Sequence, residues 1–407
     1  MKLSDEFIQD ILKKVPGSKK AAEGVLLPTE DGYFHLRGMT PKKETEGLSN
    51  EEHLFLPFCS KKEIIRLRSI SGPHDYLLRL RANAINDCPR AVRVMTSRRE
   101  KYEESGRPWS LSHYYHSKDY YHKSYIKLLN KNHRKLVKAV PSGLANIDEV
   151  NALCIKSLAG DVVLVSESLE YFYYFMTIAF YGNNYGIDCI DRVDALIIAI
   201  RIIKGSEALD FEIDPRGELP HDTERSIQLL VSQQMQFTFG HEYAHYLCGH
   251  IPSADTLMNM KSSASFMSEL AMYNHSLEYE ADYYALKNIE NKNAEFVGVT
   301  IGGFSVLIYL HFLEEYGKGF GSNNLSVSDT HPAAKDRVYK LFSNLGKKAP
   351  IGVTAIDEMF SVVEEMSELL ESRIEYLKDE YDDLLGFYGS IYLPSYMKGM
   401  KKDRIDF

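Results

Sequence analysis

Cysteine is scarce in this chain. The 407 residues include five cysteines, widely spaced along the sequence, and no two of them form a C-x-x-C pair. An odd number of scattered cysteines argues against a small secreted domain held together by disulfide bonds, and it fits a reducing compartment. We therefore expect a cytoplasmic protein.

The two segments that we identify as most hydrophobic are also too short to be long apolar runs. Tyr171–Tyr181 and Ala195–Ile203 both fall well short of the roughly 20 residues that span a bilayer. The N-terminal segment, residues 1–15, is amphipathic and lacks the uninterrupted apolar core and the cleavage site of a signal peptide. We expect a soluble protein with no membrane partner, in which both apolar stretches form buried core helices.

The composition excludes a disordered or fibrous chain. Hydrophobic residues make up 44% and charged residues 26%, which is close to the globular average. The formal net charge of −9 hides an asymmetry, because residues 61–138 contain 19 Lys and Arg against 7 Asp and Glu. This basic stretch has a balance of +12, so the remainder of the chain carries about −21.

The basic stretch, residues 61–138, is also rich in tyrosine and histidine, and two interpretations stay open. Clustered basic and aromatic side chains bind phosphate and stack on bases, which would indicate a nucleic-acid partner. Alternatively, the stretch is a helical layer whose cationic face lies against acidic parts of the same protein. We favour the second interpretation, because no recognisable nucleic-acid-binding module accompanies the charge.

Helices are expected to dominate the second half of the chain. A strand pair is expected around residues 151–165 and is followed directly by a helix; further helices are expected over residues 222–248, 266–289 and 356–385. Between Asp357 and Asp383 the last helix has 11 acidic and 2 basic residues. Its apolar stripe fits packing on its own domain, which we favour, or a coiled coil or partner-binding role.

The segment with the clearest chemical meaning is residues 240–250, GHEYAHYLCGH, which contains the pattern H-E-x-x-H. Residues four apart share a face of a helix, so His241 and His245 can bind one tetrahedral zinc ion together. Glu242 lies beside them, where its carboxylate can act as general base toward the water that the metal activates. The alternative, a helix with two surface histidines, is less consistent with the apolar turns that precede the pattern.

A third metal ligand is expected elsewhere, because catalytic zinc takes three protein ligands and keeps one open position. The metzincin spacing fails here, since it requires a histidine six residues after His245 and His250 stands at five. Downstream, Glu278 and Asp282 lie four residues apart on one face of a predicted helix. Glu278 can complete the zinc site and Asp282 can accept a hydrogen bond from a ligand histidine, although a solvated helix face is the alternative for Glu278 alone.

H-E-x-x-H followed by a helix that carries E-x-x-A-D resembles gluzincin metallopeptidases of the HtpX and CAAX-prenyl-protease kind. Three further features resemble that family in order: His250, the run from Asn151 to the strand at residues 162–165, and Thr330-His331-Pro332 with Arg337. The resemblance covers residues 151–341, about half of the chain.

The resemblance also implies roles for residues outside the metal ligands. It implies that the strand at residues 162–165 is the edge strand along which an extended peptide lies. It further implies that His331 or Arg337 helps to hold the substrate or the oxyanion, while a plain turn residue before proline is an equal alternative for His331.

Members of that family usually carry transmembrane helices, and we expect none here. Residues 241–250 are similar to the active-site helix of the Lit-like phage-exclusion peptidases, which are soluble bacterial proteases that act on a host translation factor. The ImmA-like soluble peptidases, which cut a repressor, share the zinc ligands and are usually smaller.

These patterns predict an α+β protein, predominantly α-helical, with a zincin-like metallopeptidase domain whose small β-sheet lies beside the H-E-x-x-H helix. We expect a basic N-terminal helical region over residues 1–140, the zinc metallopeptidase domain over 141–345 and an acidic C-terminal helical extension over 346–407. The predicted function is Zn²⁺-dependent hydrolysis of peptide bonds in an intracellular protein, in the Lit-like manner of phage defence. Three alternatives stay open: an ImmA-like regulatory peptidase, a latent peptidase released by a partner, and a non-catalytic zinc-containing module that binds nucleic acid or a partner.

Overall fold

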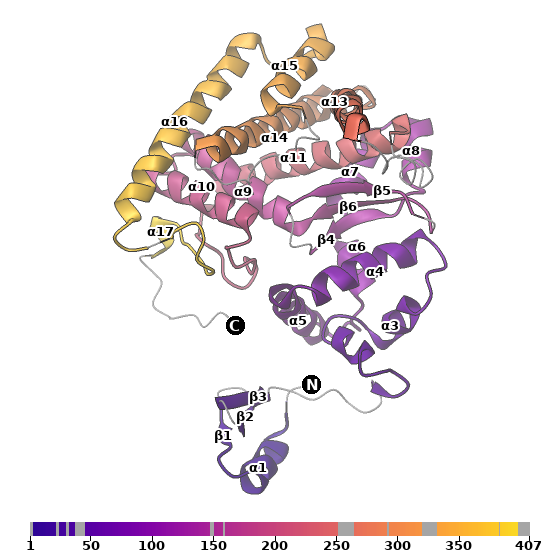
Figure 1. Ribbon diagram of the computed structural model, residues 1–407, viewed down its shortest axis with the longest axis vertical. Helices are drawn as coiled ribbons and strands as arrows, with labels where there is room; N and C mark the ends of the chain where they lie inside the picture. Colours follow the sequence, from indigo (N-terminus) through magenta and orange to yellow (C-terminus); the bar gives the residue numbers. More distant parts are fainter. Residues whose placement is uncertain are drawn as a thin grey trace.

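The computed structural model describes residues 3–21, 24–29, 32–36, 45–146, 150–157, 159–250, 264–290, 293–319, 332–381 and 383–397. The described chain is mostly helical and contains two small three-stranded sheets, which is an α+β architecture (Figure 1).

The first sheet lies in the N-terminal unit, which Figure 1 draws below the rest of the molecule. Helix α1 (Asp5–Lys14) is capped by the Ser4 hydroxyl, and it is followed by three antiparallel strands in the order β1-β2-β3. These strands are β1 (Lys19–Lys20), β2 (Val25–Thr29) and β3 (Gly32–Leu36). The expectation that residues 1–140 are helical is therefore wrong for this unit, because the backbone pairing between these strands outweighs the weak local pattern.

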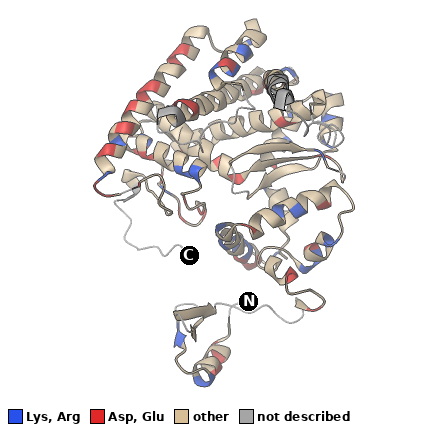
Figure 2. Cartoon of the chain, viewed as in Figure 1, with Lys and Arg blue, Asp and Glu red and all other residues tan. Residues whose placement is uncertain are grey.

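The basic stretch forms a layer of helices, as expected. The short helix η1 (Glu52–Phe55) precedes it. The helices of the stretch are α3 (Lys61–Leu67), α4 (Pro73–Asn86), α5 (Pro89–Glu104), α6 (Leu111–Ser117), α7 (Tyr120–Leu128) and α8 (Lys131–Val137). Figure 2 shows the blue Lys and Arg residues on α3, α4 and α5. Several of these cations form ion pairs with later parts of the chain: Arg93 with Asp210 at 2.6 Å and Arg98 with Glu167 at 2.7 Å.

The second sheet lies beneath the central helices and has the order β4-β6-β5. Strand β4 (Ser142–Ala145) runs parallel to β6 (Val162–Ser166), and β5 (Ala152–Ile155) runs antiparallel to it. The strand at residues 162–165, expected at the edge, is thus the central strand, and every residue of β6 is buried. A continuous apolar run is typical of a strand covered on both sides. Among the described residues, β5 forms the edge of this sheet on the far side of β6 from β4.

Helices of the second half pack above this sheet (Figure 1). They are α9 (Glu167–Tyr181), η2 (Gly182–Tyr185), α10 (Cys189–Lys204), α11 (His221–Cys248), α13 (Ala264–Lys287), α14 (Asn293–Gly319), α15 (Ala334–Leu345), η4 (Gly346–Lys348), α16 (Val353–Leu377) and α17 (Pro394–Met397). Helix α11 is central and contacts α7, α9, α13 and α14. A Cβ at Gly302 of α14 would lie 2.6 Å from the backbone of Gln233, so this glycine allows α14 to approach α11 closely.

The expected acidic helix is α16, and it ends at Leu377 instead of near residue 385. Its apolar stripe, which includes Ile356, Phe360, Val363 and Met366, is buried, and the helix packs on α10 and α14. Figure 2 shows red residues along its outer face.

Helix α14 contains an apolar segment that is longer than Tyr171–Tyr181 and Ala195–Ile203, the two stretches identified from the sequence. Asn293–Tyr316 spans 24 residues with a mean hydropathy of 1.9, and by length and composition it is the one helix of the described chain that could cross a membrane. In the structure 78% of its most apolar window is buried, which is also the behaviour of a core helix.

Candidate metal centre

Helix α11 carries the H-E-x-x-H pattern where it is enclosed by α7 and α13. Gly240, directly before the pattern, allows close packing, because a Cβ there would lie 2.6 Å from the ring of Tyr125 on α7. The Tyr125 hydroxyl donates a hydrogen bond of 2.6 Å to the backbone carbonyl of Ala285 on α13. One tyrosine therefore joins the two helices that carry the predicted metal ligands.

The three predicted ligands converge. His241 Nε2 lies 3.0 Å from His245 Nε2 and 3.4 Å from Glu278 Oε2, and His245 Nε2 lies 3.3 Å from Glu278 Oε1. Zinc–nitrogen and zinc–oxygen bonds of 2.0–2.2 Å in a tetrahedral arrangement separate the donor atoms by about 3.4 Å. The two contacts to Glu278 involve different oxygens of its carboxylate. The two histidine Nε2 atoms and this carboxylate, here called the donor triangle, are thus separated by distances near those that a tetrahedral zinc ion requires.

Asp282 contacts His241 at Nδ1, and Arg337 in turn fixes Asp282. Asp282 Oδ1 lies 2.9 Å from His241 Nδ1, and Arg337 donates two hydrogen bonds of 2.8 Å, one to each carboxylate oxygen of Asp282. Burial alone would raise the pKa of Asp282, but the charge and hydrogen bonds of Arg337 outweigh it and hold this pKa below its usual value. Asp282 therefore stays ionised and orients His241 with Nε2 toward the other donors.

The surroundings of His241 favour the protonated form of its imidazole. Burial acts to lower its pKa, but the hydrogen bonds to Asp282 and Glu278 outweigh burial and raise the pKa to about 10. A metal ion binding here must displace the proton on Nε2, as is general for histidine ligands.

His245 has a partner of its own that was not assigned from the sequence. Its Nδ1 lies 3.1 Å from His250 Nδ1, and His250 Nε2 lies 3.3 Å from a carboxylate oxygen of Glu280. The turn at Gly249, which has a φ of 72°, brings His250 back against the last turn of α11. Only the glycine after the helix signalled this turn in the sequence.

Metal binding by His245 would determine the tautomers of both His245 and His250. If His245 Nε2 binds a metal, its Nδ1 carries the proton and donates it to His250 Nδ1, so His250 Nε2–H donates to Glu280. Burial lowers the pKa of His250, and the neighbouring charge of His245 lowers it further, which favours the neutral acceptor that this arrangement needs. Cys248, His250 and Glu280 also bring donor atoms within 4.8 Å of one another.

Glu242 is buried and faces the sheet side of α11. Burial and the charge of Glu242 raise the pKa of the Cys154 thiol on β5, which places the carboxylate near this strand. Helix α11 also contacts β5 directly. The predicted general base thus lies close enough to β5 for its charge to act on Cys154.

The remaining predicted residues divide into two groups. Arg337, on α15, is brought to the centre, but its guanidinium is engaged by Asp282 and lies 3.4 Å from Glu278, so its predicted contact with substrate stays a prediction. Thr330 and His331 lie outside the described residues.

Comparison with known proteins gives one match. Residues 212–351 match the model of the family Peptidase U49. This segment is 140 of the 407 residues, and it includes the donor triangle, Glu242, Asp282 and Arg337. The match supports a peptidase. No curated protein and no solved structure matches the chain.

Proposed function

We propose that this chain is a zinc-dependent endopeptidase with a zincin-like domain, in which His241, His245 and Glu278 hold the zinc ion. The observation that carries the proposal is the convergence of the three side chains: the two Nε2 atoms are 3.0 Å apart, and each lies 3.3 to 3.4 Å from one oxygen of the Glu278 carboxylate. Two imidazoles and one carboxylate are a donor set that zinc prefers in catalytic sites, where a fourth position stays open. The match over residues 212–351 supports a peptidase independently.

The residues of the chain have separate tasks in this proposal. Zinc at the donor triangle would polarise the peptide carbonyl and lower the pKa of water. The Glu242 carboxylate accepts a proton from the attacking water and returns it to the leaving amine, as the C–N bond breaks and a C–O bond forms. Asp282 holds His241 in the tautomer that presents Nε2.

The free edge of β5 is suited to hold an extended peptide substrate. An exposed strand edge offers unpaired backbone N–H and C=O groups, with which a peptide forms main-chain hydrogen bonds. Because β5 contacts α11 and Cys154 lies near Glu242, a peptide on this edge would pass close to the donor triangle. This role replaces the one expected for the central strand β6.

The substrate that we propose is an intracellular protein, and the Lit-like resemblance suggests a host translation factor cut during phage infection. Glu242→Gln tests the reaction, because the amide keeps the shape of the side chain and cannot accept the proton. We expect cleavage to fall by about two to four orders of magnitude, with zinc content unchanged at about one per chain. Expression of both forms in a bacterial host, followed by a proteomic search for new protein termini, measures the difference. Equal sets of termini from both forms would contradict the role of Glu242.

A further inference from the structure

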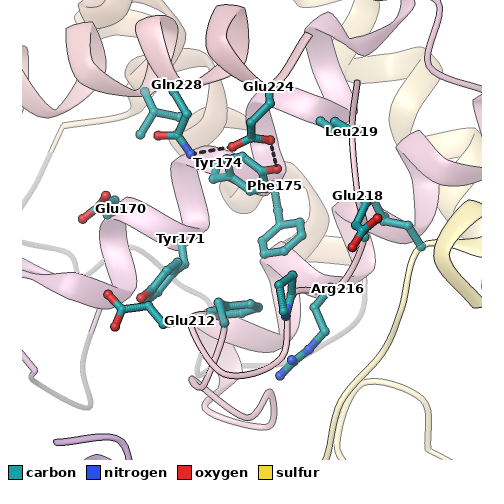
Figure 3. Close-up of a pocket in the computed structure, with 15 residues that line it drawn as sticks. Glu170, Tyr171, Tyr174, Phe175, Glu212, Arg216, Glu218, Leu219, Glu224 and Gln228 are labelled. Atoms are coloured by element: carbon teal, nitrogen blue, oxygen red, sulfur yellow. Dashed lines mark hydrogen bonds between the residues drawn. The ribbon is translucent and has the colours of Figure 1, made fainter. Parts of the chain in front are cut away.

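A cavity of about 450 Å³ lies away from the metal centre, between α9, residues 211–219 and the first turns of α11 (Figure 3). It is lined by aromatic rings and carboxylates, and we call it the acidic-aromatic pocket. Val231 of its lining precedes His241 by ten residues, which corresponds to about 15 Å along α11. None of the donors of the metal centre lines it, and its volume is that of a small-molecule site.

One wall of the pocket is built from aromatic rings. The ring centroids of Tyr171 and Phe211 are 4.5 Å apart, those of Phe175 and Phe211 are 5.2 Å apart, and those of Tyr174 and Phe175 are 5.1 Å apart. The Arg216 guanidinium lies 4.7 Å from the Phe211 centroid. Because aromatic faces attract cations, this wall suits a positively charged group with an apolar stem.

Two charged residues that line the pocket, Arg216 and Glu212, already have partners of opposite charge within the protein. Arg216 donates hydrogen bonds of 2.8 Å to Glu207 and to Asp210, so its positive charge is neutralised behind the pocket. Glu212 accepts a hydrogen bond of 3.0 Å from Arg98. Neither residue therefore decides the sign of the charge that the pocket offers to a ligand.

Within the part of the chain that the structure describes, the groups that hold the Glu224 carboxylate are neutral. The Tyr174 hydroxyl donates a hydrogen bond of 2.6 Å to one oxygen, and the Gln228 amide donates one of 2.9 Å to the other (Figure 3). These bonds fix the carboxylate in place without cancelling its charge. A positioned and uncompensated carboxylate beside aromatic rings is the arrangement that an organic cation recognises.

Glu170 and Glu218 are two further carboxyl groups that line the pocket. Glu170 accepts a hydrogen bond of 2.7 Å from the Tyr121 hydroxyl, and burial raises its pKa despite that bond. Glu218 lines the exposed side of the pocket. Among the residues that the structure describes, no Lys, Arg or His forms an ion pair with Glu170, Glu218 or Glu224. The pocket thus presents carboxylates that lack a cationic partner.

We propose that the acidic-aromatic pocket binds an organic cation, namely an alkylammonium or guanidinium group on an apolar stem, between the aromatic wall and Glu224. The cation can come from a free small amine or from a basic side chain of a protein. The same carboxylates disfavour an anion. This site goes beyond the proposed peptidase function and does not depend on it.

The test uses the full-length protein and isothermal titration with four probes that share a five-carbon chain: pentylamine, pentylguanidine, pentan-1-ol and pentanoate. We expect the two cations to bind about tenfold more tightly than the alcohol, with no binding of pentanoate. Glu224→Gln should weaken the binding of pentylamine by about tenfold, because the amide keeps the shape of the side chain but removes the charge. Glu295→Gln, an exposed change on α14, is the matched control and should leave binding unchanged.

The zinc content and the thermal midpoint of each variant are measured as well. Glu224→Gln should keep both at wild-type values, which shows that its weaker binding of pentylamine comes neither from the metal centre nor from a folding defect. A pentan-1-ol affinity equal to that of pentylamine would overturn the proposal, as would full pentylamine binding by Glu224→Gln. Displacement of pentylamine by the peptide Ac-Ala-Ala-Lys-Ala-Ala-NH2 supports a protein side chain as the source. Failure of that peptide to displace a bound pentylamine supports a free amine.

Discussion

At the scale of single residues, the two ligand histidines of the candidate metal centre have different partners. His241 is held by a carboxylate, Asp282, which Arg337 fixes with two hydrogen bonds. His245 is held by another imidazole, His250. In each pair the partner occupies Nδ1, which leaves Nε2 of the ligand histidine directed at the common point.

Asp282→Asn should weaken zinc binding. The amide preserves the shape but loses the negative charge that stabilises the His241 ring, so we expect the dissociation constant for zinc to rise about 10- to 100-fold. Competition with a chromophoric chelator measures this constant without an activity assay. Asp87→Asn, an exposed change that follows α4, is the control and should bind zinc as the wild type does. An unchanged zinc affinity in Asp282→Asn would contradict the orienting role of this carboxylate.

His250 should act on the metal only through His245. His250→Ala removes the acceptor for the His245 Nδ1–H, and we expect zinc affinity to fall about tenfold. His250→Asn retains an acceptor oxygen near the position of Nδ1, so it should restore most of the lost affinity. The same chelator competition measures both variants. Wild-type affinity in His250→Ala, or equal losses in the two variants, would rule out this positioning role.

At the scale of elements, the metal-bearing helix α11 depends on its contact with α7. Tyr125 of α7 lies against Gly240, and His122 of α7 packs with its ring centroid 5.4 Å from that of Phe239. His122 is buried, and this burial lowers its pKa to about 4. A neutral imidazole is therefore part of the packing between α7 and α11.

This contact should make stability depend on pH below neutrality. Because the pKa of His122 is near 4 in the folded chain and about 6.5 when unfolded, the unfolded state binds the proton first, and stability falls as pH decreases from about 6.5 to 4. The contribution approaches about 3 kcal/mol once both states are protonated. Urea unfolding of wild type and His122→Gln at pH 7, 5.5 and 4 measures it, and the variant should lose this part of the decrease. His221→Gln, at an exposed position, should keep the wild-type profile.

At the scale of the whole molecule, the basic stretch belongs to the same core as the metal-bearing helices. One cluster of buried apolar side chains extends from Leu56 to Leu393 and crosses the predicted boundary between residues 140 and 141. The buried residues Ile8 and Val25 of the N-terminal unit lie outside that cluster. The predicted boundaries at residues 140 and 345 stay predictions, but the core at the first of them is continuous.

Two truncations should therefore behave differently. A chain that begins at residue 45 should retain zinc stoichiometry and a cooperative thermal transition, because the shared core is complete. A chain that begins at residue 141 lacks α4 and α7, which contact the sheet and α11, so we expect it to lose the cooperative transition. Calorimetry and metal analysis of both chains test this. Cooperative unfolding of the shorter chain would contradict the shared core.

The sequence by itself determined the features that depend on local spacing. The pairs His241 with His245 and Glu278 with Asp282 follow from the helical repeat, since residues four apart share a face wherever the helix lies. The bounds of α11 followed from its apolar pattern and from Gly249, and the strand pair before Ser166 followed from β-branched residues next to a turn. An α+β chain with mostly helices could be predicted for the same reason.

Only the tertiary structure decided which distant groups meet. Whether β6 is an edge or a central strand depends on β4, which pairs with it from about twenty residues away and carries little local signal. The contact of Arg337 with Asp282 and that of His250 with Glu280 join separate helices, so no spacing along the chain contains them. The acidic-aromatic pocket could not be predicted from the sequence either, because its charge depends on which carboxylates of the described residues lack a cationic partner in the folded chain.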